Sequence, residues 1–243
     1  PLRRASETAE IIKSCLQENQ GKTLPLEISK RLIEVDLPLW ENMPREQVMA
    51  QFPEQYECWK KYPHKLKMSD PRQEDAEEFF PVLSLYEQAK QFWSSLLERH
   101  EGETILVVAH NGINRCLLMS ALGIEPCYYH CLQQSNCCIN ILNFSGPWGS
   151  KVQLESLNLL AHQGKNFPEP RDPSSGLRLL LVRHGETQWN QEGRFQGQID
   201  VPLNENGRHQ AYQAAQFLKD VSLDFAVSSP MLRPKETAEI ILQ

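Results

Sequence analysis

The sequence predicts an α/β protein in which a mostly parallel central sheet is flanked by helices. Two apolar runs of strand-forming residues, 104–109 and 179–182, are each followed closely by a histidine and a glycine. Stretches with helical spacing lie between such runs, which is the alternation typical of parallel sheets. Ligands of open α/β sheets bind at the carboxyl ends of the strands. The two histidines are therefore expected at a functional edge of the sheet.

The composition is that of an ordinary globular protein. The chain has 243 residues, of which 40% are hydrophobic and 23% are charged, enough to bury a core in one or two domains. A net charge of -6 gives no electrostatic reason to expect nucleic acid. No apolar run approaches the roughly 20 residues of a membrane-spanning helix, so no membrane partner is expected.

The start of the chain shows no signal-peptide pattern, which favours a cytoplasmic protein. The first residue is Pro1 rather than Met, so a targeting segment could lie outside this chain, and the plastid stroma is then the alternative compartment. Reduced thiols are expected, because the number of cysteines is odd and the chain is too large to need disulfides. The cysteines are at 15, 58, 116, 127, 131, 137 and 138.

A zinc cluster is the alternative for four of these thiols. Cys127, Cys131, Cys137 and Cys138 lie near His130, but their spacing does not match the usual pairs of zinc ligands. We therefore expect no metal and no other cofactor.

An internal repeat predicts the domain organisation. Residues 1–12 recur as 230–241 with eight of twelve positions identical, so that Arg4 corresponds to Arg233, 229 positions later. A repeat of that length is a whole domain. The chain therefore contains the parts of one domain in circularly permuted order. We expect the C-terminal portion of a first domain at 1–144, a Gly-, Pro- and Ser-rich linker at 145–176, and the N-terminal portion of a second domain at 177–243.

The first segment alternates helices and strands. Ala9, Ile12 and Leu16 have the spacing of a helix over 6–16. The pattern over 44–62 is also helical but is interrupted by Pro53, which predicts two short helices. The other elements expected are a strand and loop over 24–35, a helix over 83–100, a buried strand over 104–109, a helix over 113–122 and a strand over 137–144.

The second segment begins with the other buried strand, 179–182. A loop over 193–206, a helix over 207–220 and a strand over 223–227 follow it. Ser228, Ser229 and Pro230 then lead into the repeated helix.

The residues after the strand 179–182 carry the chemistry. They read Arg183-His184-Gly185-Glu186-Thr187, with Trp189 and Asn190 close behind. A histidine after a strand is more often structural, but here it has neighbours that neutralise an incoming anion, as a nucleophile that attacks an anion requires. This spacing closely resembles the signature of the histidine phosphatase superfamily, the phosphoglycerate mutase-like branch. The resemblance implies a phosphoglycerate mutase-like fold in which this histidine becomes phosphorylated.

The resemblance also assigns roles to residues of both segments. Arg183 and Asn190 would hold the phosphoryl group, with Thr187 as a further substrate-binding candidate. Ser-Ser-Pro-x-x-Arg gives Arg233 as the second phosphate arginine, and Arg4 is its counterpart in the earlier domain. Arginine suits this role because its planar fork binds phosphoryl oxygens in a bidentate manner.

In the first segment, Glu34 matches the family's proton donor and His110 its second histidine, with Asn111 beside it. The glycines that usually follow the acid are missing, so Asp36 and Glu41 stay open as alternative acids. The segments around His110 and Asn136 most resemble plant and cyanobacterial members that include carboxyarabinitol-phosphate phosphatases.

The expected function is metal-independent hydrolysis of a small phosphorylated metabolite, a sugar or sugar-acid phosphate, through phosphohistidine. Phosphoglycerate mutase-type transfer is one alternative, and a noncatalytic fragment or phospho-ligand-binding module is another. The two segments are expected to dock, with the repeated helices competing for one position. Exchange of half-domains between chains, a form of self-association, is the alternative to docking within one chain.

Overall fold

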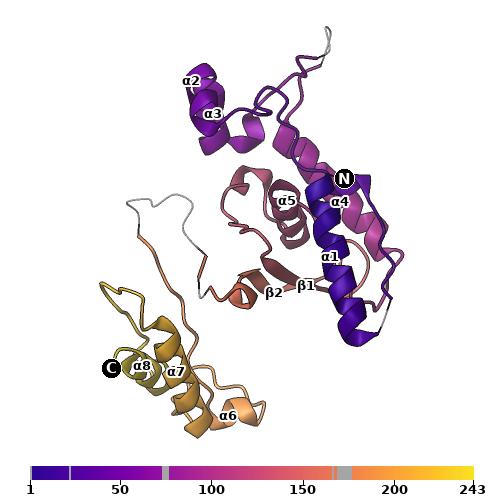
Figure 1. Ribbon diagram of the computed structural model, residues 1–243. Coiled ribbons are helices and arrows are strands. Elements are labelled where there is room, and N and C mark those ends of the chain that lie inside the picture. The colour runs from indigo at the N-terminus through magenta and orange to yellow at the C-terminus, as the bar shows by residue number, and fades with distance from the viewer. Residues whose placement is uncertain (1, 22, 73–76, 166, 169–176) are drawn as a thin grey trace. The chain divides into compact units, whose positions relative to one another are not determined.

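The computed structural model describes residues 2–21, 23–72, 77–165, 167–168 and 177–243 (Figure 1). The chain divides into two compact units, Pro1–Pro168 and Glu169–Gln243, which we call unit 1 and unit 2. Within the described ranges, no helix is both long and apolar enough to cross a membrane.

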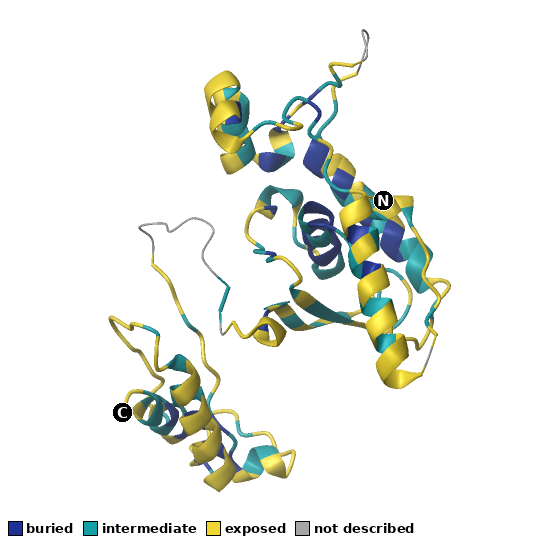
Figure 2. Ribbon diagram, viewed as in Figure 1, coloured by how far each residue is buried: buried dark blue, intermediate teal, exposed yellow. Residues whose placement is uncertain are grey.

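Unit 1 is built around two packed helices, α4 (Pro81–Leu97) and α5 (Asn111–Leu122). Their facing sides are buried (Figure 2) and enclose Val82, Leu85, Phe92, Ile113 and Met119. The Trp93 indole N–H, also buried, donates to the Leu117 carbonyl at 2.9 Å. The other helices of this unit are α1 (Arg3–Gln20), η1 (Lys30–Leu32), α2 (Arg45–Gln51), α3 (Pro53–Lys61), η2 (Pro63–Lys65), η3 (Pro126–Tyr128) and η4 (Ala161–Gln163).

Several helix boundaries follow the sequence signals. Pro53 is the first residue of α3, so the helical pattern is divided where the sequence predicted. Gly123 caps α5 in the left-handed conformation, at φ 70°, which glycine adopts without strain.

Unit 1 also contains a two-stranded antiparallel sheet, β1 (Ile139–Phe144) and β2 (Val152–Leu159). β2 lies inside the interval 145–176 that was expected to be a linker, and η4 follows it. The sequence of β2 alternates in burial along its length, as a half-buried strand does. Residues 169–176 of the expected linker lie outside the described residues.

Unit 2 is a smaller helical unit that contains α6 (Gln188–Gln191), α7 (Glu205–Leu218) and α8 (Leu232–Ile241). α7 packs against α8. Ala211 of α7 is buried, and so is Leu203, which pairs with Thr187 in an isolated β-bridge. An ion pair between Arg208 of α7 and Glu236 of α8, 2.6 Å between nitrogen and oxygen, also joins the two helices.

The predicted parallel sheet is absent from the part of the chain that the structure describes, where the only sheet is β1–β2. The segments 104–109, 179–182 and 223–227, and the tentative strand within 24–35, form no ladder. Apolar side chains in these segments are exposed, with Leu106 at 61%, Leu181 at 93% and Val227 at 85%. A strand needs a hydrogen-bonded neighbour, and the described residues of the two units supply none to these segments.

Candidate active site

In unit 2, the Gly185 carbonyl and the Arg233 side chain contact the His184 ring, and these two contacts indicate which ring nitrogen carries the proton. Its Nδ1 lies 2.8 Å from the Gly185 carbonyl oxygen, which can only accept, so Nδ1 carries the proton. Its Nε2 lies 3.2 Å from Nε of Arg233, which can only donate. The ring is therefore held as the neutral tautomer, with the lone pair of Nε2 directed at the arginine.

Arg233 is held rigidly in this position. It is 7% exposed, and its Nη1 and Nη2 donate to the carbonyl oxygens of Ile199 and Gly197, both at 2.9 Å. The acceptors of Arg233, including His184, are all neutral. The guanidinium charge therefore stays available to an anion that approaches Nε2 of His184.

The backbone next to His184 is locked to α8 and α7 by contacts that tolerate no side chain. The Gly185 N–H donates to the Thr237 hydroxyl at 3.1 Å, and this buried hydroxyl donates to the Arg233 carbonyl at 2.7 Å. A Cβ atom on Gly185 would overlap the Gly207 backbone, and one on Gly207 would overlap the Glu186 backbone. Sequence reasoning missed Gly207 and Thr237, although Thr237 lies in the repeat.

Thr187 and Asn190 form a capping box that begins α6. The Thr187 hydroxyl accepts from the Asn190 N–H at 3.1 Å, and the Asn190 side-chain oxygen accepts from the Thr187 N–H at 3.2 Å. The amide nitrogen of Asn190 is not used in this cap. Arg183 is exposed on the other side of His184 in the sequence.

In unit 1, the N-terminus of α5 binds the Glu34 carboxylate. Its Oε2 accepts from the Gly112 N–H at 3.0 Å, and its Oε1 accepts from the N–H groups of Ile113 at 3.0 Å and Val35 at 2.9 Å. A Cβ on Gly112 would lie 2.5 Å from Oε1. The positive end of the helix dipole and these donors both stabilise the carboxylate.

His110 is the N-cap of α5 and lies next to this carboxylate in the same unit. It is 7% exposed, and its buried Nε2 has no hydrogen-bond partner among the described residues. Burial lowers the pKa of His110, the charge of Glu34 opposes that shift, and the charge of Arg4 adds to it. Arg4 itself is exposed on α1.

Asn111, the first residue of α5, is held by the loop that follows the helix. Its side-chain nitrogen donates to the Gln134 carbonyl at 2.8 Å. Gln134 is 2% exposed, and its amide exchanges hydrogen bonds with the Asn140 side chain at 2.8 and 3.2 Å. A buried polar network thus fixes the start of α5.

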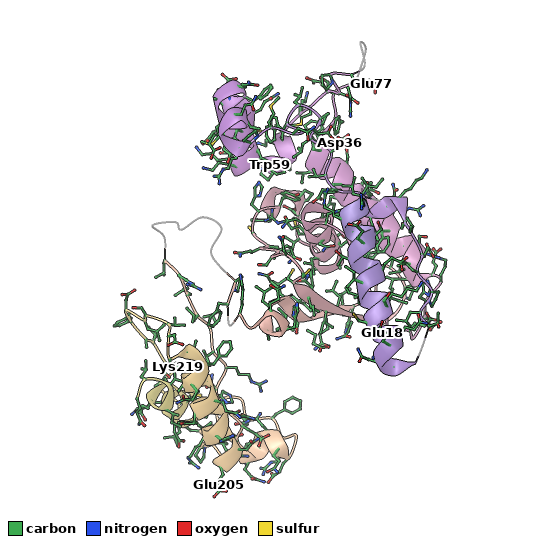
Figure 3. The ribbon with its side chains drawn as sticks, in the orientation of Figure 1. Glu18, Asp36, Trp59, Glu77, Glu205 and Lys219 are labelled. Atoms are coloured by element: carbon green, nitrogen blue, oxygen red, sulfur yellow. The ribbon has the colours of Figure 1, made fainter. Side chains whose placement is uncertain are left out.

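The alternative acids lie near Glu34 in the sequence but are more exposed. Partial burial raises the pKa of Asp36 (labelled in Figure 3), and the negative charge of Glu41 raises it further. Arg72 acts in the opposite direction, although it is paired mainly with Asp70 at 2.7 Å.

The cysteines considered as zinc ligands form no disulfide bond among the described residues. Among the described residues, no three His, Cys, Asp or Glu side chains are grouped as a metal site would require.

The structure brings the predicted residues together in two groups. His184, Arg233, Thr187 and Asn190 belong to unit 2, together with Arg183. Glu34, His110, Asn111 and Arg4 belong to unit 1.

The chain is similar to curated plant phosphatases over its whole length. It is 30% identical over 247 residues to 2-carboxy-D-arabinitol-1-phosphatase of Triticum aestivum, covering 100% of this chain and 47% of the relative. It is 28% identical to the probable 2-carboxy-D-arabinitol-1-phosphatase of Arabidopsis thaliana, covering 99% of this chain and 48% of that protein. The chain thus spans about half the length of these relatives.

Solved structures share its fold. The Bacillus stearothermophilus protein YhfR matches with a TM-score of 0.54 and 21% identity, covering 66% of this chain and 71% of that one. A mycobacterial glucosyl-3-phosphoglycerate phosphatase matches with a TM-score of 0.51 and 21% identity, covering 66% and 74%. The model of the histidine phosphatase superfamily (branch 1) matches residues 1–158 and 179–243, and this chain therefore belongs to that superfamily.

Proposed function

We propose that the protein hydrolyses phosphomonoesters of small metabolites, sugar or sugar-acid phosphates, through a phosphohistidine at His184. The observation that carries the proposal is the contact between His184 and Arg233, in which the arginine Nε donates to Nε2 of the histidine at 3.2 Å. A nucleophile of this kind is poised to attack an anion that the arginine attracts.

In the first step, Nε2 of His184 forms a bond to phosphorus, and the bond from phosphorus to the ester oxygen breaks. The leaving alkoxide takes a proton from the acid form of Glu34, and the N–H donors of Gly112, Ile113 and Val35 then stabilise the carboxylate that this transfer leaves. In the second step, Glu34 removes a proton from water, which attacks phosphorus and releases phosphate from His184. Arg183, Arg233 and the Asn190 amide bind the phosphoryl oxygens in this proposal.

The residues of unit 1 complete the proposed set. His110 would contribute its buried Nε2, which has no hydrogen-bond partner among the described residues, and Asn111 would contact the substrate. Arg4 is the counterpart of Arg233 in the repeat. The proposal thus needs residues of both units. Unit 2 provides the nucleophile and the phosphate-binding residues, and unit 1 provides the proton donor and the second histidine.

The substrate class is supported by the plant relatives, one of which is a phosphatase of 2-carboxy-D-arabinitol 1-phosphate by its name. Mutase-type transfer is a second candidate. A 67-residue match is 52% identical to the probable phosphoglycerate mutase of Cronobacter sakazakii. A 63-residue match of the same identity is to an uncharacterized phosphatase of Bacillus subtilis. Analysis of the product separates the two, because a hydrolase gives inorganic phosphate and a mutase gives a second phosphate ester.

The test is turnover of para-nitrophenyl phosphate by the whole chain and by two histidine variants. We expect His184→Ala to abolish phosphate release, while His209→Ala, an exposed position on α7, keeps it. Label from a phosphorylated substrate should stay on the wild-type protein after a base quench and be lost after an acid quench. Normal turnover by His184→Ala would refute the mechanism.

A further inference from the structure

A closed circuit of four hydrogen bonds joins the His184 ring to Arg233. Nδ1 of His184 donates to the Gly185 carbonyl at 2.8 Å, and the Gly185 N–H donates to the Thr237 hydroxyl at 3.1 Å. This hydroxyl donates to the Arg233 carbonyl at 2.7 Å, and Nε of Arg233 donates to Nε2 of His184 at 3.2 Å. The placement of the histidine relative to the arginine therefore depends on the hydroxyl of Thr237.

Thr237 lies four residues after Arg233 in α8, so the two side chains lie on the same face of the helix. The hydroxyl uses its only proton in the bond to the Arg233 carbonyl, which leaves an oxygen lone pair for the Gly185 N–H. The side chain is 4% exposed, and a buried polar group costs free energy unless it is hydrogen-bonded. Valine has nearly the same shape and needs no such partner. The bond to Gly185, rather than the packing of α8, therefore accounts for a hydroxyl at this position.

The backbone at Gly185 is also held from the side of α7. A Cβ atom on Gly185 would overlap the Gly207 backbone, so the two backbones lie in direct contact. The Glu186 N–H donates to the side-chain oxygen of Gln210 at 2.9 Å, and this N–H shares a planar peptide group with the Gly185 carbonyl. α7 thus orients the carbonyl that binds the imidazole. Thr237 of α8 orients the peptide group before it.

We propose that Thr237 is a positioning residue, which holds Nε2 of His184 beside the Arg233 guanidinium for the attack on phosphorus. The catalytic consequence rests on the proposed function, and Thr237 itself does not touch the substrate. Without the hydroxyl, the buried Gly185 N–H loses its acceptor, and its peptide group rotates to find another. That rotation shifts the His184 side chain away from the arginine, and a small displacement of a nucleophile costs much of its rate.

The position of the ring proton reports this role directly. The carbonyl at Nδ1 and the guanidinium at Nε2 together keep the proton of His184 on Nδ1. A ring that moves away from Arg233 exposes Nε2 to water, and the proton then distributes between the two nitrogens. A hydroxyl that served only the stability of unit 2 would have no effect on this distribution in the folded protein.

The first test reads the His184 tautomer in the whole chain from the ring nitrogen chemical shifts in an NMR spectrum. The signal that His184→Ala removes assigns the residue. We expect one tautomer, with the proton on Nδ1, in the wild type and in Thr237→Ser, which keeps the hydroxyl. Thr237→Val should give a mixture of the two tautomers. A valine variant with the wild-type tautomer alone would overturn the proposal, and so would a wild type with the proton on Nε2.

The second test measures turnover of para-nitrophenyl phosphate at a temperature at which circular dichroism shows each variant to be folded. Thr237→Val should lower kcat and kcat/KM alike, by roughly 10- to 100-fold, because the nucleophile is displaced in the transition state. Thr237→Ser should keep most of the rate. Thr23→Val, the same change as Thr237→Val at an exposed position outside α8, should leave it unchanged. If the valine variant does not fold, Thr237→Ala removes the same hydroxyl and gives the same comparison.

The outcomes separate this inference from the proposed function. An active wild type and an equally active, folded Thr237→Val would overturn the positioning role and leave the function standing. A wild type that releases no phosphate would refute the proposed function, and the tautomer in Thr237→Val would still decide whether the hydroxyl positions the ring.

Discussion

Replacing Glu34 by glutamine should destabilise unit 1, because the N-terminus of α5 is built around a carboxylate. A glutamine oxygen can still accept from Val35 and Ile113, but its amide group then faces the Gly112 N–H, which donates to Oε2 at 3.0 Å in the wild type. One hydrogen bond to a charged group is lost, worth about 1.5–3 kcal/mol, and the helix dipole loses its anion, worth about 0.3–1 kcal/mol. The expected loss is about 2–4 kcal/mol.

Thermal unfolding followed by circular dichroism measures this loss. For a unit of this size, about 2–4 kcal/mol lowers the unfolding temperature by roughly 4–16 °C. Glu41→Gln is the control, because Glu41 is exposed and only 3.5 Å from Arg72, a contact worth at most about 1 kcal/mol. Equal unfolding temperatures for the two variants would show that α5 does not depend on the Glu34 carboxylate.

Three further outcomes are expected. Gly207→Ala should unfold unit 2 at a lower temperature than the wild type, because its Cβ would overlap the Glu186 backbone, and an unchanged transition would contradict that packing. Because burial lowers the pKa of His110, the unfolded chain binds a proton that the folded chain does not. Stability should therefore be retained above about pH 6.5 and fall as the pH drops toward the folded pKa. Urea midpoints at pH 7.5 and 5.5 should differ less in His110→Gln than in the wild type, with His209→Gln as the control. Phosphatase activity should survive EDTA, because arginines and histidines supply the charge that a metal would bring, whereas loss on chelation with recovery on adding zinc would refute this.

Local signals in the sequence predicted the helices of this protein well. The Pro53 interruption, the Gly123 cap and the apolar face of α4 act over a few residues, and each has the expected effect in the structure. The family signature was also local, since its residues lie within one strand and turn. These features do not depend on which other segments are nearby.

The sheet and the supports of the site were harder to predict, because they depend on distant partners. The segment 104–109 has the composition of a buried strand. A strand must also pair with a second strand, and the local sequence does not show which segment that is. Thr237 supports Gly185 across 52 residues, and Gly112 binds Glu34 across 78. β2 was overlooked because polar residues alternate with its apolar ones and because glycines and prolines lie on both sides of it in the sequence.

Arg233 places a positive charge beside His184 and also holds the loop that contains Gly197 and Ile199. Because one guanidinium binds the carbonyl oxygens of Gly197 and Ile199, the loop and the cation beside His184 are fixed by the same side chain. Arg233 makes these three contacts from three different nitrogens in a planar group, whereas a lysine would have to donate all of them from one nitrogen. Arg233→Lys would therefore keep the charge and release the loop, in which Phe195 is already fully exposed at 100%. Protease sensitivity near residue 197 would then rise without any change in net charge.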